Sequence, residues 1–197
     1  MPPQTLRALA GLPTEPAPLR ESVLVLIDCQ NTYRAGTMQL SGVEPALAEA
    51  ARLLARARTA GIPVFHIQHD DGPGSLYDIS GPTGRISDEV APLAGETVVT
   101  KQYPNAFVGT DLEQHLRAAG AANVILAGFM THMCVNSTAR AAFNLGFQPI
   151  VVASATATRD LPGEGDSVVP AALVQMASLA ALRDLFAIVV PSCEQLG

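Results

Sequence analysis

The sequence of 197 residues has few charged side chains, few aromatic side chains and only three cysteines. Charged residues make up 15% of the chain, aromatic residues make up 5%, and tryptophan is absent. The single lysine and the eleven arginines form no cluster, and the formal net charge is −6. This charge balance argues against nucleic acid or an anionic membrane surface as the main partner.

The cysteine count and the hydropathy pattern indicate where in the cell the protein is expected. An odd and sparse set of cysteines makes no disulfide framework and favours the reducing cytoplasm. Every apolar run is far shorter than the ~20 residues that a membrane-spanning helix needs. The opening residues MPPQTLRALAGLP lack the continuous apolar stretch of a signal peptide. We therefore expect a cytoplasmic protein without a membrane partner.

Hydrophobic residues make up 48% of the chain, which is typical of a globular protein. Residues 1–21 hold five of the fifteen prolines and show no periodic pattern, so we expect an irregular arm that lies on the body or on a partner subunit. The length favours one domain. The sequence therefore predicts an N-terminal arm at 1–21 and a single domain at 22–197.

Short apolar runs alternate with helical patterns after the arm. The predicted strands are residues 22–28, 62–69, 97–101, 123–128, 148–154 and 186–190. The predicted helices are residues 43–61, 110–119, 133–146 and 168–184. Strands that are apolar along their whole length indicate a parallel sheet covered on both faces. The expected fold is α/β, a three-layer doubly wound sheet of about six mainly parallel strands.

Residues 70–96 are rich in glycine and proline and contain one short helical pattern. The segment is longer than the ~12–15 residues of an ordinary connection, and we expect it to be a lid or substrate loop. With residues 154–167, it is where substrate specificity should lie.

Three residues with reactive side chains lie at or after the ends of predicted strands. Asp28 ends the first strand, Lys101 ends the third, and Cys134 follows the fourth, in the stretch GFMTHMCVNS. Ligands of open parallel sheets bind beyond the carboxyl ends of the strands. Taken singly, Asp28 could cap a turn, Lys101 could be a surface lysine and Cys134 could be a small core residue. The functional reading depends on the three together.

Together these three residues form a chemically sensible set. Cys134 should lie in the first turn of a helix, where free N–H groups and the nearby lysine favour a thiolate near neutral pH. Asp28 could accept the thiol proton and deliver it to a leaving amine if burial raises its pKa. Sulfur would attack a carbonyl group, and the thioester formed would then be hydrolysed by water.

The same residues carry a resemblance to a known family. VLVLIDCQNTY, VVTKQYPNAFVGTDL and VILAGFMTHMCVNSTARAAFNLGF resemble the three motif blocks of the isochorismatase-like cysteine hydrolases, in the right order, over about residues 22–190. The resemblance implies that Asp28, Lys101 and Cys134 are the catalytic triad of a fold of this class. It also implies a small-molecule substrate and a homo-oligomer, a dimer or a tetramer.

Two backbone features follow from the resemblance alone. It implies a cis peptide bond between Phe129 and Met130. It also implies that the N–H groups of Met130 and Cys134 form an oxyanion hole.

The chain departs from the metal-binding members of the family. Nicotinamidases bind a divalent metal through an Asp-x-His pair and a further histidine, and no histidine lies between Asp28 and His66 here. His66 and His69 should point to opposite faces of their strand, so a core or loop-anchoring role is favoured over metal ligation for them. We expect no metal and no cofactor.

Five further residues are candidates for substrate contact, each with a structural alternative. They are Gln30, Tyr77, Asn105, Phe107 and Phe129. Gln30 could instead cap a turn, Tyr77 could anchor its loop, and the residues after Lys101 could pack within theirs. His132 is too close in sequence to Cys134 to be favoured as its partner in a dyad. Cys29 should be core, and Cys193 should be exposed and inert.

The sequence therefore predicts a metal-independent cysteine hydrolase that cleaves the C–N bond of a small amide, carbamoyl or lactam-like compound. A retained Cys134 favours this over the vinyl-ether cleavage of isochorismatases, which does not depend on the cysteine. A thiol redox sensor, a catalytically silent binding protein and an ether hydrolase remain open alternatives.

Overall fold

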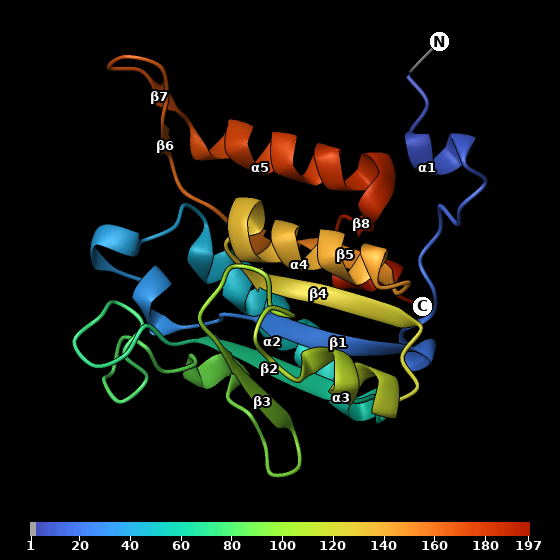
Figure 1. The fold of residues 1–197 in the computed structure, drawn as a ribbon, viewed down its shortest axis with the longest axis horizontal. Helices are drawn as coiled ribbons and strands as arrows, with labels where there is room; N and C mark the ends of the chain where they lie inside the picture. Colours follow the sequence, from blue (N-terminus) through green and yellow to red (C-terminus); the bar gives the residue numbers. More distant parts are fainter. Residues whose placement is uncertain (1–2) are drawn as a thin grey trace.

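The computed structural model describes residues 3–197 and is built round a six-stranded parallel sheet (Figure 1). The strands lie in the order β3-β2-β1-β4-β5-β8. Their bounds are β1 Ser22–Ile27, β2 Val64–His69, β3 Thr97–Lys101, β4 Asn123–Phe129, β5 Gln148–Ala157 and β8 Ile188–Val190. The six predicted strands and the doubly wound topology are confirmed, and every pairing in this sheet is parallel.

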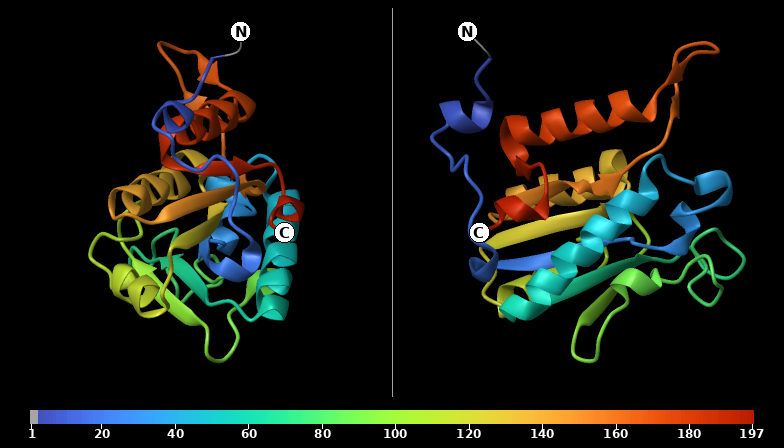
Figure 2. Two further views of the ribbon diagram at one scale, coloured as in Figure 1. Left: turned by 90° about the vertical axis from the view of Figure 1, so that its right-hand side faces the viewer. Right: turned by 180° about the vertical axis from the view of Figure 1, so that it is seen from behind.

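Helices cover both faces of the sheet (Figures 1 and 2). Their bounds are α1 Leu6–Leu9, α2 Val43–Ala60, α3 Leu112–Ala118, α4 Asn136–Asn144 and α5 Ala171–Ala181. Helix α2 packs on one face, and α3 and α4 pack on the other. Helix α2 is capped by Gly61, whose φ of 66° is in the left-handed region that favours glycine.

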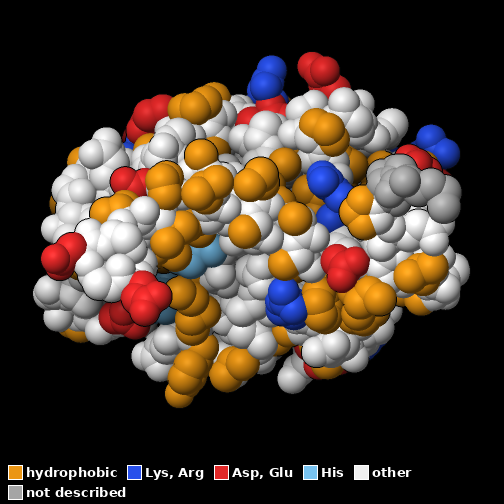
Figure 3. Space-filling view, turned by 90° about the horizontal axis from the view of Figure 1, so that it is seen from above, with side chains coloured by type: hydrophobic (Ala, Val, Ile, Leu, Met, Phe, Trp, Pro, Cys, Tyr) orange, Lys and Arg blue, Asp and Glu red, His pale blue; other side chains and the backbone are white. Residues whose placement is uncertain are grey.

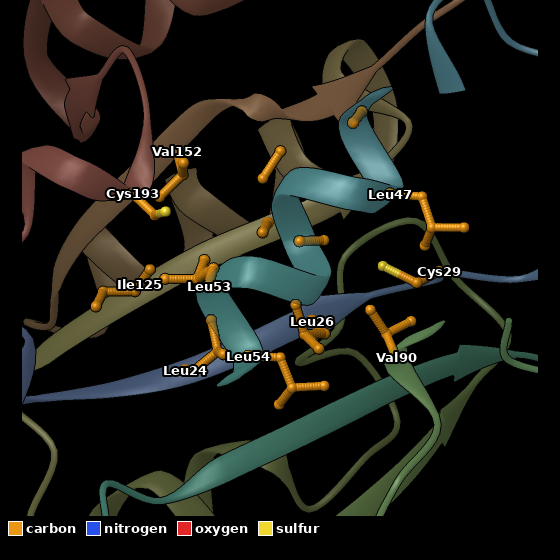
Figure 4. Close-up of a cluster of buried hydrophobic side chains, with 14 of the residues drawn as sticks. Leu24, Leu26, Cys29, Leu47, Leu53, Leu54, Val90, Ile125, Val152 and Cys193 are labelled. Atoms are coloured by element: carbon orange, nitrogen blue, oxygen red, sulfur yellow. The ribbon is translucent and has the colours of Figure 1, made fainter. Parts of the chain in front are cut away.

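The larger core cluster lies between α2 and the sheet (Figure 4). Cys29 is buried there, as predicted. Cys193 is buried in the same cluster, so the prediction that it is exposed is wrong. Its backbone N–H donates to Glu49 Oε1 at 2.8 Å, which docks the C-terminal tail on α2. Tail docking of this kind has no local sequence signal.

The N-terminal arm lies on the body of the protein. It contains the short helix α1 and a buried arginine, Arg7. The guanidinium of Arg7 donates to Leu185 O at 3.0 Å and to Gln148 Oε1 at 2.9 Å. The backbone N–H of Leu6 donates to Asp184 Oδ1 at 2.9 Å. These contacts fix the arm against the segment that follows α5.

The predicted helix at 168–184 begins late. Residues Val168–Val169 form β7, which pairs antiparallel with β6, Leu161–Pro162. The resulting hairpin projects from the body beside α5 (Figures 1 and 2). The β-branched valines favour an extended backbone, and the sequence pattern did not predict that Leu161–Pro162 would pair with them.

Residues 70–96 form a long connection that contains only a 3₁₀ turn, Asp88–Val90. The side chains of Gln30 and Gln68 both donate to Gly84 O, at 2.7 and 2.8 Å. A Cβ at Gly84 would lie 2.2 Å from Asp78 O, so only glycine fits this close approach. No helix within the described residues is long and apolar enough to cross a membrane.

Candidate active site

Four neighbouring strands deliver one polar side chain each to the same edge of the sheet. Lys101 ends β3, His69 ends β2 and Asp28 follows β1. Cys134 lies in the turn after β4. Because these strands are adjacent and parallel, their carboxyl ends meet, as the rule for open α/β sheets requires. The predicted convergence of Asp28, Lys101 and Cys134 is therefore present.

Asp28 is fully buried and has an unusual backbone conformation. Its φ is 48°, and within residues 3–197 it is the one non-glycine residue with a positive φ. This left-handed conformation is uncommon for residues with a side chain, and such residues gather at functional sites. The backbone N–H of Asp28 donates to Ile67 O at 3.0 Å, which ties the residue to β2.

Lys101 contacts each of the three other polar side chains of the site. Its ammonium nitrogen lies 2.7 Å from Asp28 Oδ2, 2.9 Å from His69 Nδ1 and 3.5 Å from Cys134 Sγ. The side chain of Lys101 is 1% exposed, so these contacts form away from water. A buried charge needs a partner, and Asp28 supplies it.

Cys134 lies in a π-helical turn, Thr131–Val135, that leads into α4. Turns of this type are frequent at functional sites. The peptide bond between Phe129 and Met130 is cis, as the resemblance implied. The turn follows Gly128, at which a Cβ would lie 2.0 Å from Ile27 O of β1. Glycine at this point lets β1 and β4 approach closely enough to bring Asp28 and Cys134 together.

Burial dominates the proton affinities at the site. It raises the pKa of the Cys134 thiol, the charge of Asp28 raises that pKa further, and Lys101 lowers it. Burial also raises the pKa of Asp28, against the opposing effect of Lys101. The expectation of a thiolate near neutral pH is therefore wrong for the resting site, because desolvation disfavours the charged sulfur. Asp28 shifts in the predicted direction, toward the range of a working base.

His69 anchors the 70–96 loop, as expected, and it also contacts Lys101, which the sequence analysis did not predict. Its Nδ1 lies 2.9 Å from Lys101 Nζ, and its Nε2 lies 2.9 Å from Asp71 Oδ1. The available signal was its place at the end of β2, since the same rule had selected Asp28 and Lys101. His66 points elsewhere, and its Nε2 lies 2.9 Å from Glu96 Oε2.

Aromatic side chains surround the triad. The Tyr77 ring lies 4.6 Å from the His69 ring, centroid to centroid, and its hydroxyl lies 3.2 Å from that of Tyr33. The buried Tyr33 ring meets Phe129 edge-to-face at 5.8 Å. Tyr77 thus brings the 70–96 loop onto the site, and Cys134 is only 4% exposed in this arrangement.

Three of the other candidates are engaged in structural contacts. Gln30 is fully buried and its amide bonds the backbone of His69, accepting from N and donating to O, both at 2.9 Å. Asn105 Oδ1 accepts from the backbone N–H of Phe107 at 3.0 Å, and the Phe107 ring stacks on Phe147 at 6.2 Å. Asn105 and Phe107 pack within their own region, as the structural alternative expected. The turn-capping alternative for Gln30 is wrong, because its side chain makes no capping hydrogen bond and bonds the backbone of β2 instead.

His132 does not pair with Cys134. Its Nδ1 lies 2.6 Å from Thr158 Oγ1, and burial lowers the pKa of its imidazole. Among residues 3–197, no group of three or more His, Cys, Asp or Glu side chains is arranged to hold a metal ion.

The side of the molecule formed by α5 and the β6–β7 hairpin exposes apolar side chains. Those at least one-third exposed are Val168, Val169, Leu173 and Met176. Figure 3 looks onto this side and shows many apolar groups across it. Helix α5 also contacts the turn that carries Cys134. This surface and the candidate site are therefore close neighbours.

Comparison with known proteins identifies relatives along almost the whole chain. The family model of the isochorismatase domain matches residues 22–193. A crystal structure of an isochorismatase from Pseudomonas putida superposes with a TM-score of 0.94 at 39% identity and covers 98% of both chains. The secreted isochorismatase effector of Verticillium dahliae is 35% identical over 95% of this chain and 97% of its own. The ureidoacrylate amidohydrolase of Pseudomonas syringae is 31% identical over 77% of this chain and 78% of its own.

Proposed function

The chain belongs to the isochorismatase family of hydrolases, and we propose that it cleaves a C–N bond of a small molecule with Cys134 as nucleophile. The observation that carries the proposal is the buried cluster in which Lys101 Nζ lies 2.7 Å from Asp28 Oδ2 and 3.5 Å from Cys134 Sγ. The similarity to an enzyme named an amidohydrolase supports an amide, carbamoyl or lactam-like substrate.

The first half-reaction forms a thioester. As the substrate carbonyl approaches, the Cys134 thiol passes its proton to Asp28, and sulfur bonds to the carbonyl carbon. The raised pKa of both groups suits this transfer, because the thiol keeps its proton at rest and the carboxylate is a stronger base than usual. Lys101 stabilises the developing negative charge on sulfur.

Collapse of a tetrahedral intermediate completes the first half-reaction. The N–H groups of Met130 and Cys134 hold the oxyanion of the tetrahedral intermediate. The intermediate collapses as the C–N bond breaks, and protonated Asp28 gives its proton to the leaving nitrogen. The second half-reaction frees the enzyme. Water attacks the thioester and passes a proton to Asp28, the bond between sulfur and carbon breaks with its electrons on sulfur, and Asp28 returns the proton to form the Cys134 thiol.

The alternative functions, a redox sensor, a silent binding protein and an ether hydrolase, require different properties of Cys134 and its neighbours. A redox-sensor cysteine has a low pKa and is accessible to oxidant, whereas Cys134 has a raised pKa and is 4% exposed. A silent binding protein has no use for a buried ion pair, which is expensive to maintain. Ether hydrolysis, as in isochorismatases, does not need the sulfur.

Ammonia release from a panel of small amides and ureido compounds tests the proposal. We expect at least one substrate to be turned over, the thioester to be trapped on Cys134 by mass spectrometry, and Cys134→Ala to remove the activity. Ammonia release that survives Cys134→Ala would overturn the assignment of Cys134 as nucleophile, whereas turnover of ether or ester compounds alone, unchanged in Cys134→Ala, would replace the proposal with ether or ester hydrolysis. Reversible peroxide oxidation of Cys134 without turnover would identify a sensor.

We also propose a cytoplasmic location and a homo-oligomer. All three cysteines are free thiols, which suits a reducing compartment, although one relative is named as a secreted effector. The exposed apolar side chains of α5 and the hairpin suit burial against a second copy. Cell fractionation tests the location, and light scattering of the purified protein tests for a dimer or a tetramer.

A further inference from the structure

The side chain of His69 connects the buried lysine to an acidic residue at the surface. Its Nδ1 lies 2.9 Å from Lys101 Nζ, and its Nε2 lies 2.9 Å from Asp71 Oδ1, whose side chain is 48% exposed. An ammonium group has three N–H donors and no acceptor, so Nδ1 must accept this hydrogen bond. The ring proton is then on Nε2 and is donated to Asp71. The contacts therefore define one tautomer of a neutral imidazole.

The ammonium group of Lys101 has three polar neighbours. It forms an ion pair with Asp28 Oδ2, donates a hydrogen bond to Cys134 Sγ and lies within hydrogen-bond distance of His69 Nδ1. A buried donor without an acceptor is costly, so removal of any one acceptor favours rotation or displacement of the group. His69 thus occupies the one position that leaves the other two N–H groups for the carboxylate and the sulfur.

The position of His69 is itself tightly fixed. The residue is in direct register with Lys101 across the β2–β3 pair. The amide of Gln30 bonds both the backbone N–H and the backbone C=O of His69. The Tyr77 ring packs against the imidazole. Side-chain hydrogen bonds with this much support hold their geometry closely.

We propose that His69, held in its Nε2–H tautomer by Asp71, is a positioning residue that keeps one N–H of Lys101 on the Cys134 sulfur. This role rests on the proposed function of the triad, and it assigns His69 no contact with substrate. Gln30 supports the same arrangement through the backbone. The reactivity of Cys134 therefore depends on a hydrogen-bond acceptor at position 69.

A matched pair of variants separates the acceptor role from packing. His69→Asn keeps a carbonyl oxygen near the place of Nδ1, whereas His69→Leu has similar size and no acceptor. The readout is the rate at which iodoacetamide alkylates Cys134 at one fixed pH, followed by mass spectrometry. We expect His69→Leu to slow alkylation at least about tenfold and His69→Asn to stay within about threefold of the wild type. Equal slowing in both variants would overturn the proposal in favour of a packing role.

Nitrogen NMR of the histidine rings provides a test on the wild-type chain, should His69→Leu fail to fold. The protein has four histidines, so the His69 signals can be assigned by substitution. We expect the Nε2–H tautomer, with the Nδ1 resonance shifting when Lys101 is replaced by Met. A proton on Nδ1, or no shift in Lys101→Met, would overturn the proposal.

Neither measurement needs a substrate. If no C–N compound is hydrolysed but alkylation and NMR behave as expected, the proposed function fails and the role of His69 stands. If hydrolysis is found and the two His69 variants are alkylated equally slowly, the function stands and the positioning role fails.

Discussion

Replacing Asp28 with Asn should make Cys134 a stronger acid while it abolishes hydrolysis. The resting thiol is held protonated first by burial, then by the negative charge of Asp28, and Lys101 opposes both. Asn is nearly the same size as Asp and tolerates the left-handed φ of 48° at this position. The substitution therefore removes the charge with little change of shape.

The size of the effect follows from the geometry. A unit charge 3.5 Å from the sulfur, the distance of Lys101 Nζ, is worth ~5 kcal/mol at an effective dielectric constant of about 20. That energy corresponds to between about three and four pKa units. The repulsion by Asp28 is the larger of the two charge effects on Cys134, so its removal should lower the thiol pKa by about three units or more. The thiolate then becomes the anion that pairs with Lys101.

The assay is a pH titration of thiolate absorbance, supported by the pH dependence of alkylation at Cys134. Cys29 and Cys193 are also buried thiols, so the Asp28→Asn variant that also carries Cys134→Ser provides the baseline. In the substrate panel, loss of the proton carrier should reduce turnover by about 10²–10⁴-fold.

An unchanged or higher midpoint in Asp28→Asn would refute the electrostatic reasoning, because the carboxylate would then not be what keeps the sulfur protonated. Turnover near the wild-type rate would refute the assignment of Asp28 as proton carrier. A lower titration midpoint for Cys134 together with loss of turnover would agree with both the electrostatic effect and the proton-carrier role of Asp28.

Three further changes test other parts of the structure. Arg58 holds the pKa of Glu96 at about 2, so this carboxylate contributes ~3 kcal/mol of stability that is present above about pH 4.5 and is lost as the pH falls toward 2. In Glu96→Gln, the stability measured by circular dichroism should therefore depend less on pH between 4.5 and 2. Tyr77→Ala should speed alkylation of Cys134 by opening the 70–96 loop, whereas Tyr77→Phe should not. Equal alkylation rates in the two variants would show that the Tyr77 ring does not shield Cys134 from solvent. Gly128→Ala should cost more than ~3 kcal/mol in urea unfolding or prevent folding, because its Cβ meets the backbone of β1, and wild-type stability would contradict that contact.

The sequence determined the strands of the sheet and most of its helices. Apolar runs such as residues 22–27 and 123–129 are buried along nearly their whole length, so their composition alone specifies a central parallel strand. Because parallel strands end at a common edge, the same pattern also located Asp28, Lys101 and Cys134. The strand ends and the chemistry of the side chains were both needed for that prediction, because His69 also ends a strand and was not selected.

Only the tertiary structure decided the proton affinities at the site and the contacts of His69. The pKa of Cys134 depends on how completely the chain removes the sulfur from water, and no local pattern encodes that quantity. His69 reaches the site because β2 lies between β1 and β3 and pairs His69 with Lys101, so that a ring expected to anchor a loop also contacts a buried ammonium group. The docked tail at Cys193 and the hairpin at 168–169 likewise depend on partners distant in the chain or paired across a turn, and such contacts exist only once the chain has folded.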